Sequence, residues 1–185
     1  MAKKATCDRE HDFVLVLTGV PELDSRVEDA LFEAGCDDAT LSVRCGRTFL
    51  TFSRTAATLK DAILSAIRDV KKADIGADVL RVDDCNLVTQ ADIARRIRRP
   101  RQQIHQYITG ERGPGGFPAP ACHLCDESPL WYWCEVASWL WQNDMIKEEV
   151  LRAAEQVSII NAVLELRNQR QVDPQLADEV LHSIS

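Results

Sequence analysis

The order in which two apolar patterns follow one another constrains the fold of the first 85 residues more than any other feature. Apolar runs and alternating apolar and polar residues predict strands, whereas apolar residues three and four positions apart predict helices. In this segment the patterns run strand, helix, strand, strand, helix, strand. The predicted elements cover residues 12–18, 22–34, 40–45, 48–53, 59–72 and 79–82. This order predicts a ferredoxin-like α+β domain, a four-stranded antiparallel sheet with two helices on one face.

Short signals at the ends of these elements support the assignment. Gly35 ends the first predicted helix and Thr58 caps the second. Gly46 and Arg47 alone separate the two middle strands, which is the spacing of a tight hairpin. The segment contains no evident pair of catalytic residues, and a ferredoxin-like fold serves many functions. We therefore expect no catalytic site here, and we leave open a protein partner for this domain.

Charge is distributed unevenly along the 185 residues. The net charge is -7, which for the chain as a whole argues against a nucleic-acid partner. Counted by segment, residues 1–85 carry a net -4 (12 basic, 16 acidic), residues 86–120 a net +4 (6 basic, 2 acidic) and residues 121–185 a net -7 (4 basic, 11 acidic). All six basic residues of the middle segment are arginines. A nucleic-acid site, if present, is therefore expected within residues 86–120.

Two short helices are predicted in the basic segment. Thr89 can cap a helix over residues 90–98, and Pro100 can occupy the start of a helix over residues 101–109, which Gly110 ends. Two helices joined by a tight turn are typical of a DNA-binding helix-turn-helix, in which the second helix enters the major groove.

The faces of the two helices separate core residues from candidate contact residues. Ile93 and Ile97 of the first helix, with Ile104 and Ile108 of the second, are expected to form a shared core. Arginine matches guanine and glutamine matches adenine through pairs of hydrogen bonds in the major groove. The candidates for reading bases are Arg101, Gln102, His105 and Gln106. The candidates for contacting the DNA backbone are Arg95, Arg98, Arg99 and Arg112.

A loop and an aromatic segment follow the helix pair. Residues 112–120 are rich in glycine and proline and are expected to form a loop. A strand over residues 130–133 and a helix over residues 135–142 come next. The four tryptophans of this region could stack on bases, but their spacing favours a core packed on the helix pair for most of them.

Residues 86–143, about a third of the chain, resemble the MerR-like winged helix-turn-helix group, and in particular AlpA-like and excisionase-like regulators. The resemblance lies in Val88-Thr-x-x-Asp-Ile-Ala94, Ile104-x-x-Tyr-Ile108, Gly115-Gly-Phe-Pro-Ala-Pro120 and Leu130-Trp-x-Trp-x-Glu-Val-Ala-x-Trp-Leu140. It implies that residues 101–106 lie in the major groove and that a wing around residues 110–133 meets the backbone or the minor groove. The chain departs from the family at Arg98-Arg99-Pro100, where the family usually has a glycine-bearing turn and a Ser or Thr cap.

The cysteines suggest two further hypotheses, a zinc site and a redox pair. Cys122 and Cys125 have the spacing of a zinc knuckle, with Cys134 nearby, but only His123 could be a local fourth ligand. A redox role for the pair lacks a thioredoxin-like context. We therefore expect no metal and no cofactor. Seven cysteines without the regularity of a secreted framework favour a reducing, cytoplasmic compartment.

The last 42 residues are predicted to form a helical tail, residues 144–185, that mediates dimerisation. A long helix over residues 146–169 is followed by a short one that Pro174 opens. Residues at three- and four-residue steps form a largely apolar stripe, and this stripe requires a partner. That partner could be a second copy, giving a homodimer, or the chain's own first domain. The stripe comprises Val150, Ala154, Val157, Ile160, Val163, Leu164 and Arg167.

Taken together, the sequence predicts three segments, residues 1–85, 86–143 and 144–185, and a sequence-specific double-stranded DNA-binding protein. The expected role is transcriptional regulation, as a repressor or an antitoxin-type protein, and not catalysis. The alternative is a protein-protein interaction module that acts through the acidic first domain. No apolar run approaches the ~18 residues that a membrane helix needs, so we expect no membrane partner.

Overall fold

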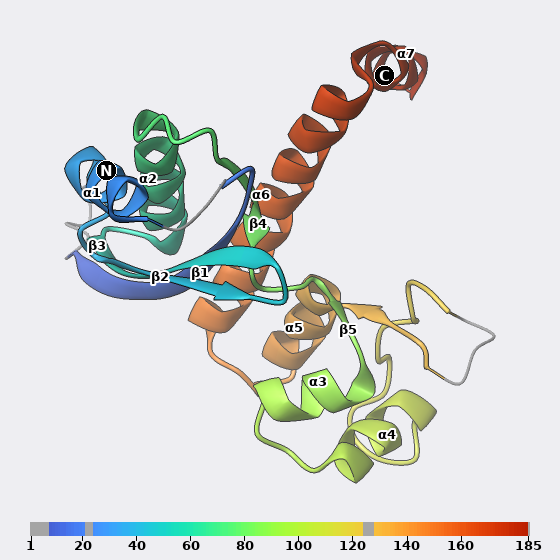
Figure 1. Ribbon diagram of the computed structural model, residues 1–185. Coiled ribbons are helices and arrows are strands. Elements are labelled where there is room, and N and C mark those ends of the chain that lie inside the picture. Colours follow the sequence, from blue (N-terminus) through green and yellow to red (C-terminus); the bar gives the residue numbers. More distant parts are fainter. Residues whose placement is uncertain (1–7, 21–23, 124–127, 185) are drawn as a thin grey trace, which may run out of the picture. The chain divides into compact units, whose positions relative to one another are not determined.

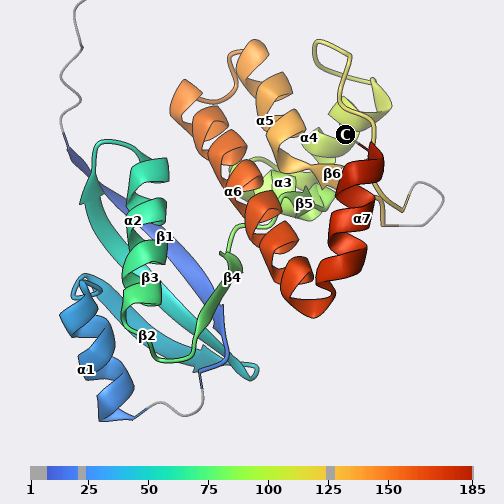
Figure 2. The ribbon, with the colours of Figure 1, turned by 90° about the horizontal axis from the view of Figure 1, so that it is seen from above.

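The computed structural model describes residues 8–20, 24–123 and 128–184, which divide into two compact units (Figures 1 and 2). Unit 1 comprises Met1–Asp84 and Ile159–Ser185, and unit 2 comprises Cys85–Ser158. The long helix α6 (Glu148–Val172) belongs to both. The predicted tail, residues 144–185, is therefore divided between the two units, with the last helix α7 (Pro174–Ile184) in unit 1.

Unit 1 contains a four-stranded antiparallel sheet with the strand order β2-β3-β1-β4. The strands and helices follow the predicted order along the chain. Helices α1 and α2 lie on the same face of the sheet (Figures 1 and 2). The bounds are β1 Arg9–Thr18, α1 Ser25–Ala34, β2 Ala39–Arg44, β3 Arg47–Ala56, α2 Leu59–Lys72 and β4 Asp78–Val82.

The helix-covered face of the sheet forms the core of unit 1. Alternate residues of β3 are buried, whereas β1 is buried continuously from Leu15 to Leu17, and Phe13 stacks on Phe52 with ring centroids 5.1 Å apart. Helix α2 contributes Ile63 and Val70, which are fully or almost fully buried. The buried residues of β3 lie two positions apart, and those of α2 lie three or four positions apart. Each element therefore presents its buried side chains on a single face, and these two faces pack together.

A buried arginine links the elements of unit 1. Arg54 occupies an inward position of β3 and is only 7% exposed. Its guanidinium forms a two-pronged ion pair with Asp38, at 2.7 and 2.8 Å, and donates to Asp69 of α2 at 2.6 Å. It also donates to the hydroxyl of Ser65 and to the carbonyl of Gly35 at the end of α1. Hydrogen bonds to the two carboxylates raise its pKa further above the usual range.

The C-terminal half of α6 covers the outer edge of β4. The side-chain amide of Asn161 accepts from the N–H of Val82 at 2.8 Å and donates to its carbonyl at 3.1 Å. Asn168 donates to the carbonyl of Leu80, and Arg167 donates to that of Val79. These side chains satisfy main-chain groups that an edge strand otherwise leaves unpaired.

Four residues of the predicted dimerisation stripe are buried within the chain itself: Ala154, Val157, Ile160 and Leu164. Two other members, Val150 and Val163, are exposed. Because α6 packs into both units of its own chain, most of this stripe is already covered. The seam predicted over residues 146–169 is therefore not free, as a whole, for a second copy.

No helix in the described ranges combines the length and apolar character needed to cross a membrane.

Candidate nucleic-acid interface

The helix pair of unit 2 begins at a capping box. The hydroxyl of Thr89 accepts from the N–H of Asp92 at 3.2 Å, and the carboxylate of Asp92 accepts from the N–H of Thr89 at 3.0 Å. Each side chain thereby satisfies a main-chain donor of the first turn. Hydrogen bonds from Thr89, followed by the contact with Arg95, hold the pKa of Asp92 below its ordinary value. This box sets the start of α3 (Gln90–Arg96), as Thr89 predicts.

The turn after α3 places an arginine where a glycine is the usual choice. Helix α3 ends at Arg96, two residues before the predicted end, because Arg98 adopts a left-handed conformation with φ of 53°. The N–H of Arg99 donates to the carbonyl of Ala94 at 2.9 Å, and the N–H of Arg98 donates to that of Arg95 at 3.3 Å. This is the Schellman pattern of a helix C-terminus, whose left-handed position is usually glycine.

Helix α4 (Arg101–Thr109) follows directly after the turn. Pro100 occupies its N-cap, and no described side chain caps the first turn. The side-chain amide of Gln90 donates to the carbonyl of Arg101 at 2.9 Å and so ties the starts of the two helices together. Ile104 and Tyr107 are buried, whereas Arg101, Gln102 and His105 are exposed. Of the two core residues predicted on α4, Ile104 is buried but Ile108 is half-buried, and the buried Tyr107 was not predicted. Of the four predicted base-reading residues, three are exposed and Gln106 is half-buried.

A compact aromatic core supports the two helices. Ile93 of α3 and Ile104 of α4 are fully buried and belong to one cluster with residues of α5 (Trp133–Gln142) and the first turns of α6. Trp131, Trp133 and Trp139 are buried in this cluster, whereas Trp141 is 42% exposed. Three of the four tryptophans are thus core residues, as their spacing indicates.

The glycine- and proline-rich loop is held against this core. The indole N–H of Trp139 donates to the carbonyl of Gly115 at 2.9 Å, and that of Trp131 donates to Pro118 at 3.1 Å. The ring of Phe117 meets both indoles edge-on, with centroids 5.0 and 6.3 Å away. Gly113 has φ of 96°, and a Cβ there would lie 2.7 Å from the ring of Tyr107. The glycines and prolines of this loop prevent regular secondary structure, and the contacts with the aromatic side chains hold the loop in place instead.

A short antiparallel pairing stands where the wing is expected. Cys122 and Leu130 form an isolated bridge, with the N–H of Leu130 donating to the carbonyl of Cys122 at 3.1 Å. Strand β6 (Trp131–Tyr132) then pairs with β5 (Leu87–Val88). Residues 124–127 of the expected wing lie outside the described residues, and so does Cys125 of the predicted cysteine pair. Among the residues that are described, no group of three or more His, Cys, Asp or Glu could hold a metal ion.

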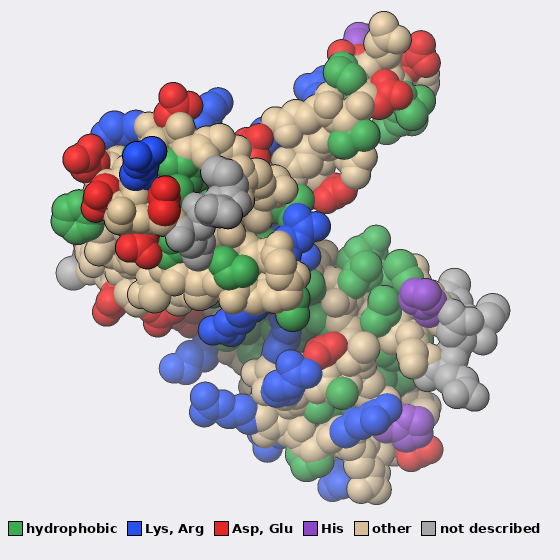
Figure 3. Space-filling view, viewed as in Figure 1, with side chains coloured by type: hydrophobic (Ala, Val, Ile, Leu, Met, Phe, Trp, Pro, Cys, Tyr) green, Lys and Arg blue, Asp and Glu red, His purple; other side chains and the backbone are tan. Residues whose placement is uncertain are grey.

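The six arginines of the basic segment have different surroundings. Arg96 lies over the ring of Trp133, 4.8 Å from its centroid, and donates to the carbonyl of Cys85, so its role is structural. Arg95 pairs with Asp92 at 2.5 Å while remaining largely exposed. The other four are exposed and form no side-chain ion pair with a described residue: Arg98, Arg99, Arg101 and Arg112. Figure 3 shows Lys and Arg side chains gathered over α3 and α4.

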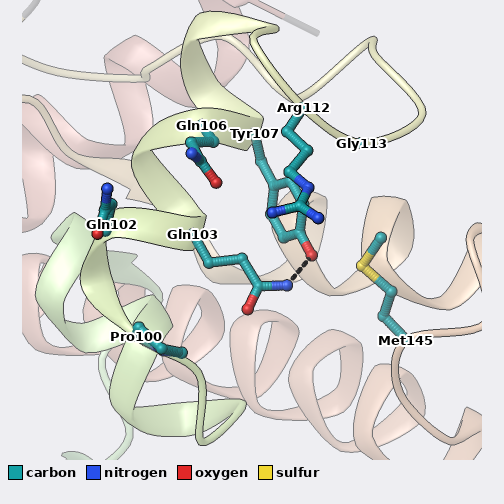
Figure 4. Close-up of a pocket in the computed structure, with 8 residues that line it drawn as sticks. All are labelled: Pro100, Gln102, Gln103, Gln106, Tyr107, Arg112, Gly113 and Met145. Atoms are coloured by element: carbon teal, nitrogen blue, oxygen red, sulfur yellow. Dashed lines mark hydrogen bonds between the residues drawn. The ribbon is translucent and has the colours of Figure 1, made fainter.

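A shallow hollow of about 610 Å³ borders α4 on the side of the loop (Figure 4). Gln102, Gln103 and Gln106 line it from the helix, and Arg112 and Met145 line it from other segments. The side-chain amide of Gln103 donates to the hydroxyl of Tyr107. Sequence reasoning missed Gln103 and Tyr107, since both positions were assigned neither to the core nor to a contact surface. The walls carry amide and guanidinium groups, which suit a polar ligand surface better than an apolar molecule.

The structure thus brings most of the predicted contact residues to a few neighbouring positions. Arg101, Gln102 and His105 share the outward side of α4, Arg98 and Arg99 form the turn before it, and Arg112 lies beside it. Gln106 faces the hollow instead of standing fully in solvent.

No family model, curated protein or solved structure matches the chain.

Proposed function

We propose that unit 2 is a winged helix-turn-helix that binds double-stranded DNA in a sequence-specific manner, and that the chain regulates transcription as a repressor or an antitoxin-type protein. Helix α4 is the reading helix, with Arg101, Gln102 and His105 directed at base edges and Gln106 at the margin of the contact. The wing is the segment around residues 110–133, in which Cys122 and Leu130 form an isolated antiparallel bridge. For unit 1, the element order and the strand order β2-β3-β1-β4 support a ferredoxin-like fold.

The observation that carries this proposal is the exposed side of α4. Arginine, glutamine and histidine face solvent together there, next to arginines that form no ion pair with any residue the structure describes. Guanidinium and amide groups match guanine and adenine in the major groove. Exposed arginines at the turn and the uncapped N–H groups at the start of α4 suit phosphate oxygens.

The first test measures duplex binding over a range of salt concentrations. Cations that contact phosphates displace condensed counterions, so log K should fall with log salt at a slope of about -0.9 per phosphate contacted. Affinity that is unchanged between low and moderate salt would contradict the proposal.

Substitutions then separate base reading from backbone contact. Gln102→Ala should cost about 1–3 kcal/mol and relax the preference at one base pair, whereas Arg95→Ala should weaken all sequences alike. Arg152→Ala is the charge-matched control, because Arg152 lies on α6 between Glu148 and Glu155. The reading helix is misassigned if Gln102→Ala and Arg95→Ala change specificity equally, or if Arg152→Ala weakens binding as much as either.

A protein-interaction role for unit 1 is the second candidate. The observation that favours it is the outer edge of strand β2, with which no strand in the described part of the chain pairs.

A further inference from the structure

The two outer edges of the sheet in unit 1 are treated differently. Strands β4 and β2 end the order β2-β3-β1-β4. The edge of β4 is hydrogen-bonded by side chains of α6, at Val79, Leu80 and Val82. No strand among the described residues pairs with the outer edge of β2. An edge that is not covered, charged or broken by proline is a template for another strand.

The hairpin geometry shows which main-chain groups of β2 point outward. Strands β2 and β3 are joined by Cys45 and Gly46, with φ of 51° and 71°, as in a two-residue type I′ turn. In such a hairpin the flanking pair, Arg44 and Arg47, is hydrogen-bonded, and the pattern then alternates along the strand. The main-chain groups of Ala39, Leu41 and Val43 therefore point away from β3.

The side chains of these three residues are apolar and lie on the face that carries the helices, because Leu41 is paired with the buried Leu50. Beside them, Phe32 of α1 is 66% exposed and Val43 is 52% exposed. A groove between α1 and β2 has a mixed lining, with the apolar Leu31, Phe32, Cys36, Ala39, Leu41 and Leu50 beside the polar Glu28, Asp37 and Thr40. The outer edge of β2 thus combines outward-pointing main-chain groups, which no described strand pairs, with apolar side chains.

We propose that a second copy of this chain occupies this edge, with the two β2 strands antiparallel about a two-fold axis at Leu41. This register places Leu41 opposite the partner's Leu41 and Ala39 opposite the partner's Val43. Leu41 of each strand then exchanges two main-chain hydrogen bonds with its counterpart, and the N–H of Val43 donates to the partner's Ala39 carbonyl. The N–H of Ala39 takes no part, because it already donates to the carbonyl of Cys36 at 3.1 Å. Directly opposite residues share a face, so the apolar side chains of both copies stay on the helix side.

Charge at the two ends of β2 selects a second copy over other occupants. The exposed Asp37 precedes the strand and the exposed Arg44 ends it, whereas the carboxylate of Asp38 is already paired with Arg54. Antiparallel pairing of identical strands brings the acidic start of each close to the basic end of the other. Parallel pairing would instead bring like charges together, which is unfavourable.

Sedimentation equilibrium of the full chain without DNA tests this interface independently of the proposed function. The natural protein should be a dimer, and Val43→Lys should raise the dissociation constant about tenfold or more, because the two-fold axis places the change in the interface twice. Val163→Lys is the matched control, since Val163 is a similarly exposed valine on α6. A protein that is monomeric throughout, a Val43→Lys dimer of unchanged affinity, or dissociation by Val163→Lys alone would each overturn the proposal.

Charge reversal decides the matter if Val43→Lys does not fold, as circular dichroism would reveal. Asp37→Arg and Arg44→Asp should each weaken the dimer, and the double variant should recover most of the lost affinity. Failure of the double variant to recover it would overturn the antiparallel arrangement, as would a pair of single changes that leave the affinity unaltered.

Discussion

Replacing Arg98 by glycine separates the stability of unit 2 from its proposed DNA binding. Arg98 sits at the left-handed position of the turn between α3 and α4, with φ of 53°. A non-glycine residue there costs roughly 1–2 kcal/mol, because its Cβ approaches the following carbonyl. Glycine loses about 0.5–1 kcal/mol more conformational entropy on folding. The net expectation is that Arg98→Gly stabilises the folded state by about 0.5–1 kcal/mol.

The same change removes one of the cations proposed to contact phosphate. Arg98→Gly should therefore raise the melting temperature of unit 2 by about 2–8 °C. It should also weaken duplex binding and reduce the salt slope by about 0.9. Thermal unfolding followed by circular dichroism and a salt titration of binding measure the two effects.

Arg99→Gly is the control for Arg98→Gly, because it removes the same charge from a neighbouring exposed residue that is not left-handed. It should lower the melting temperature while weakening DNA binding to a similar extent. Equal destabilisation by the two glycine variants would refute the turn geometry, and unchanged binding by both would refute the phosphate contacts.

Three further predictions concern packing and a thiol. Gly113→Ala should destabilise unit 2 by about 2 kcal/mol, since its Cβ would press on the Tyr107 ring, whereas Gly116→Ala, with open space around it, should cost about 1 kcal/mol in thermal unfolding. Arg54→Met should cost about 2–4 kcal/mol in a denaturant titration, because two carboxylates lose their partner, and a loss below about 0.5 kcal/mol would refute this role. Burial raises the pKa of Cys36 to about 11, so at pH 8 an alkylating reagent should modify the exposed cysteines and spare Cys36 until the chain unfolds. The folded state keeps this proton longer than the unfolded state, so this contribution to stability is present below pH 9 and is lost as pH rises towards 11.

Local signals predicted the elements of unit 1 well, because each depends on neighbouring residues. The strand alternation, the hairpin at Gly46 and the caps at Gly35 and Thr58 all act over a few positions. The ion pairs of Arg54 join residues 15 and 16 positions apart, so no local pattern shows them. The available signal was an arginine at an inward position of the β3 alternation, which implies buried carboxylate partners.

Unit 2 shows where local reasoning falls short. The predicted helix over residues 90–98 follows the apolar spacing, but the left-handed Arg98 ends α3 at Arg96. A glycine at this position would have predicted the turn from the sequence, but an arginine does not. The predicted course of α4 needed no correction, since Pro100 and Gly110 mark both ends.

The long helix α6 illustrates a limit of amphipathic patterns. Its stripe indicated that a partner was required but could not show whether that partner was the same chain or a second copy. The structure buries Ala154, Val157, Ile160 and Leu164 within the chain. Other apolar residues of this helix remain exposed, among them Ile159 and Val163, and Val163 is itself a member of the predicted stripe.

The most direct test of the central claim is selection from a random duplex DNA library with the full chain, followed by sequencing of the bound fraction. Base reading by α4 should give an enriched motif that is bound more tightly than a scrambled duplex, and Gln102→Ala should relax its preference at one base pair while Arg95→Ala preserves it. A bound fraction without any enriched motif, or no bound fraction at low salt, would contradict sequence-specific DNA binding by α4.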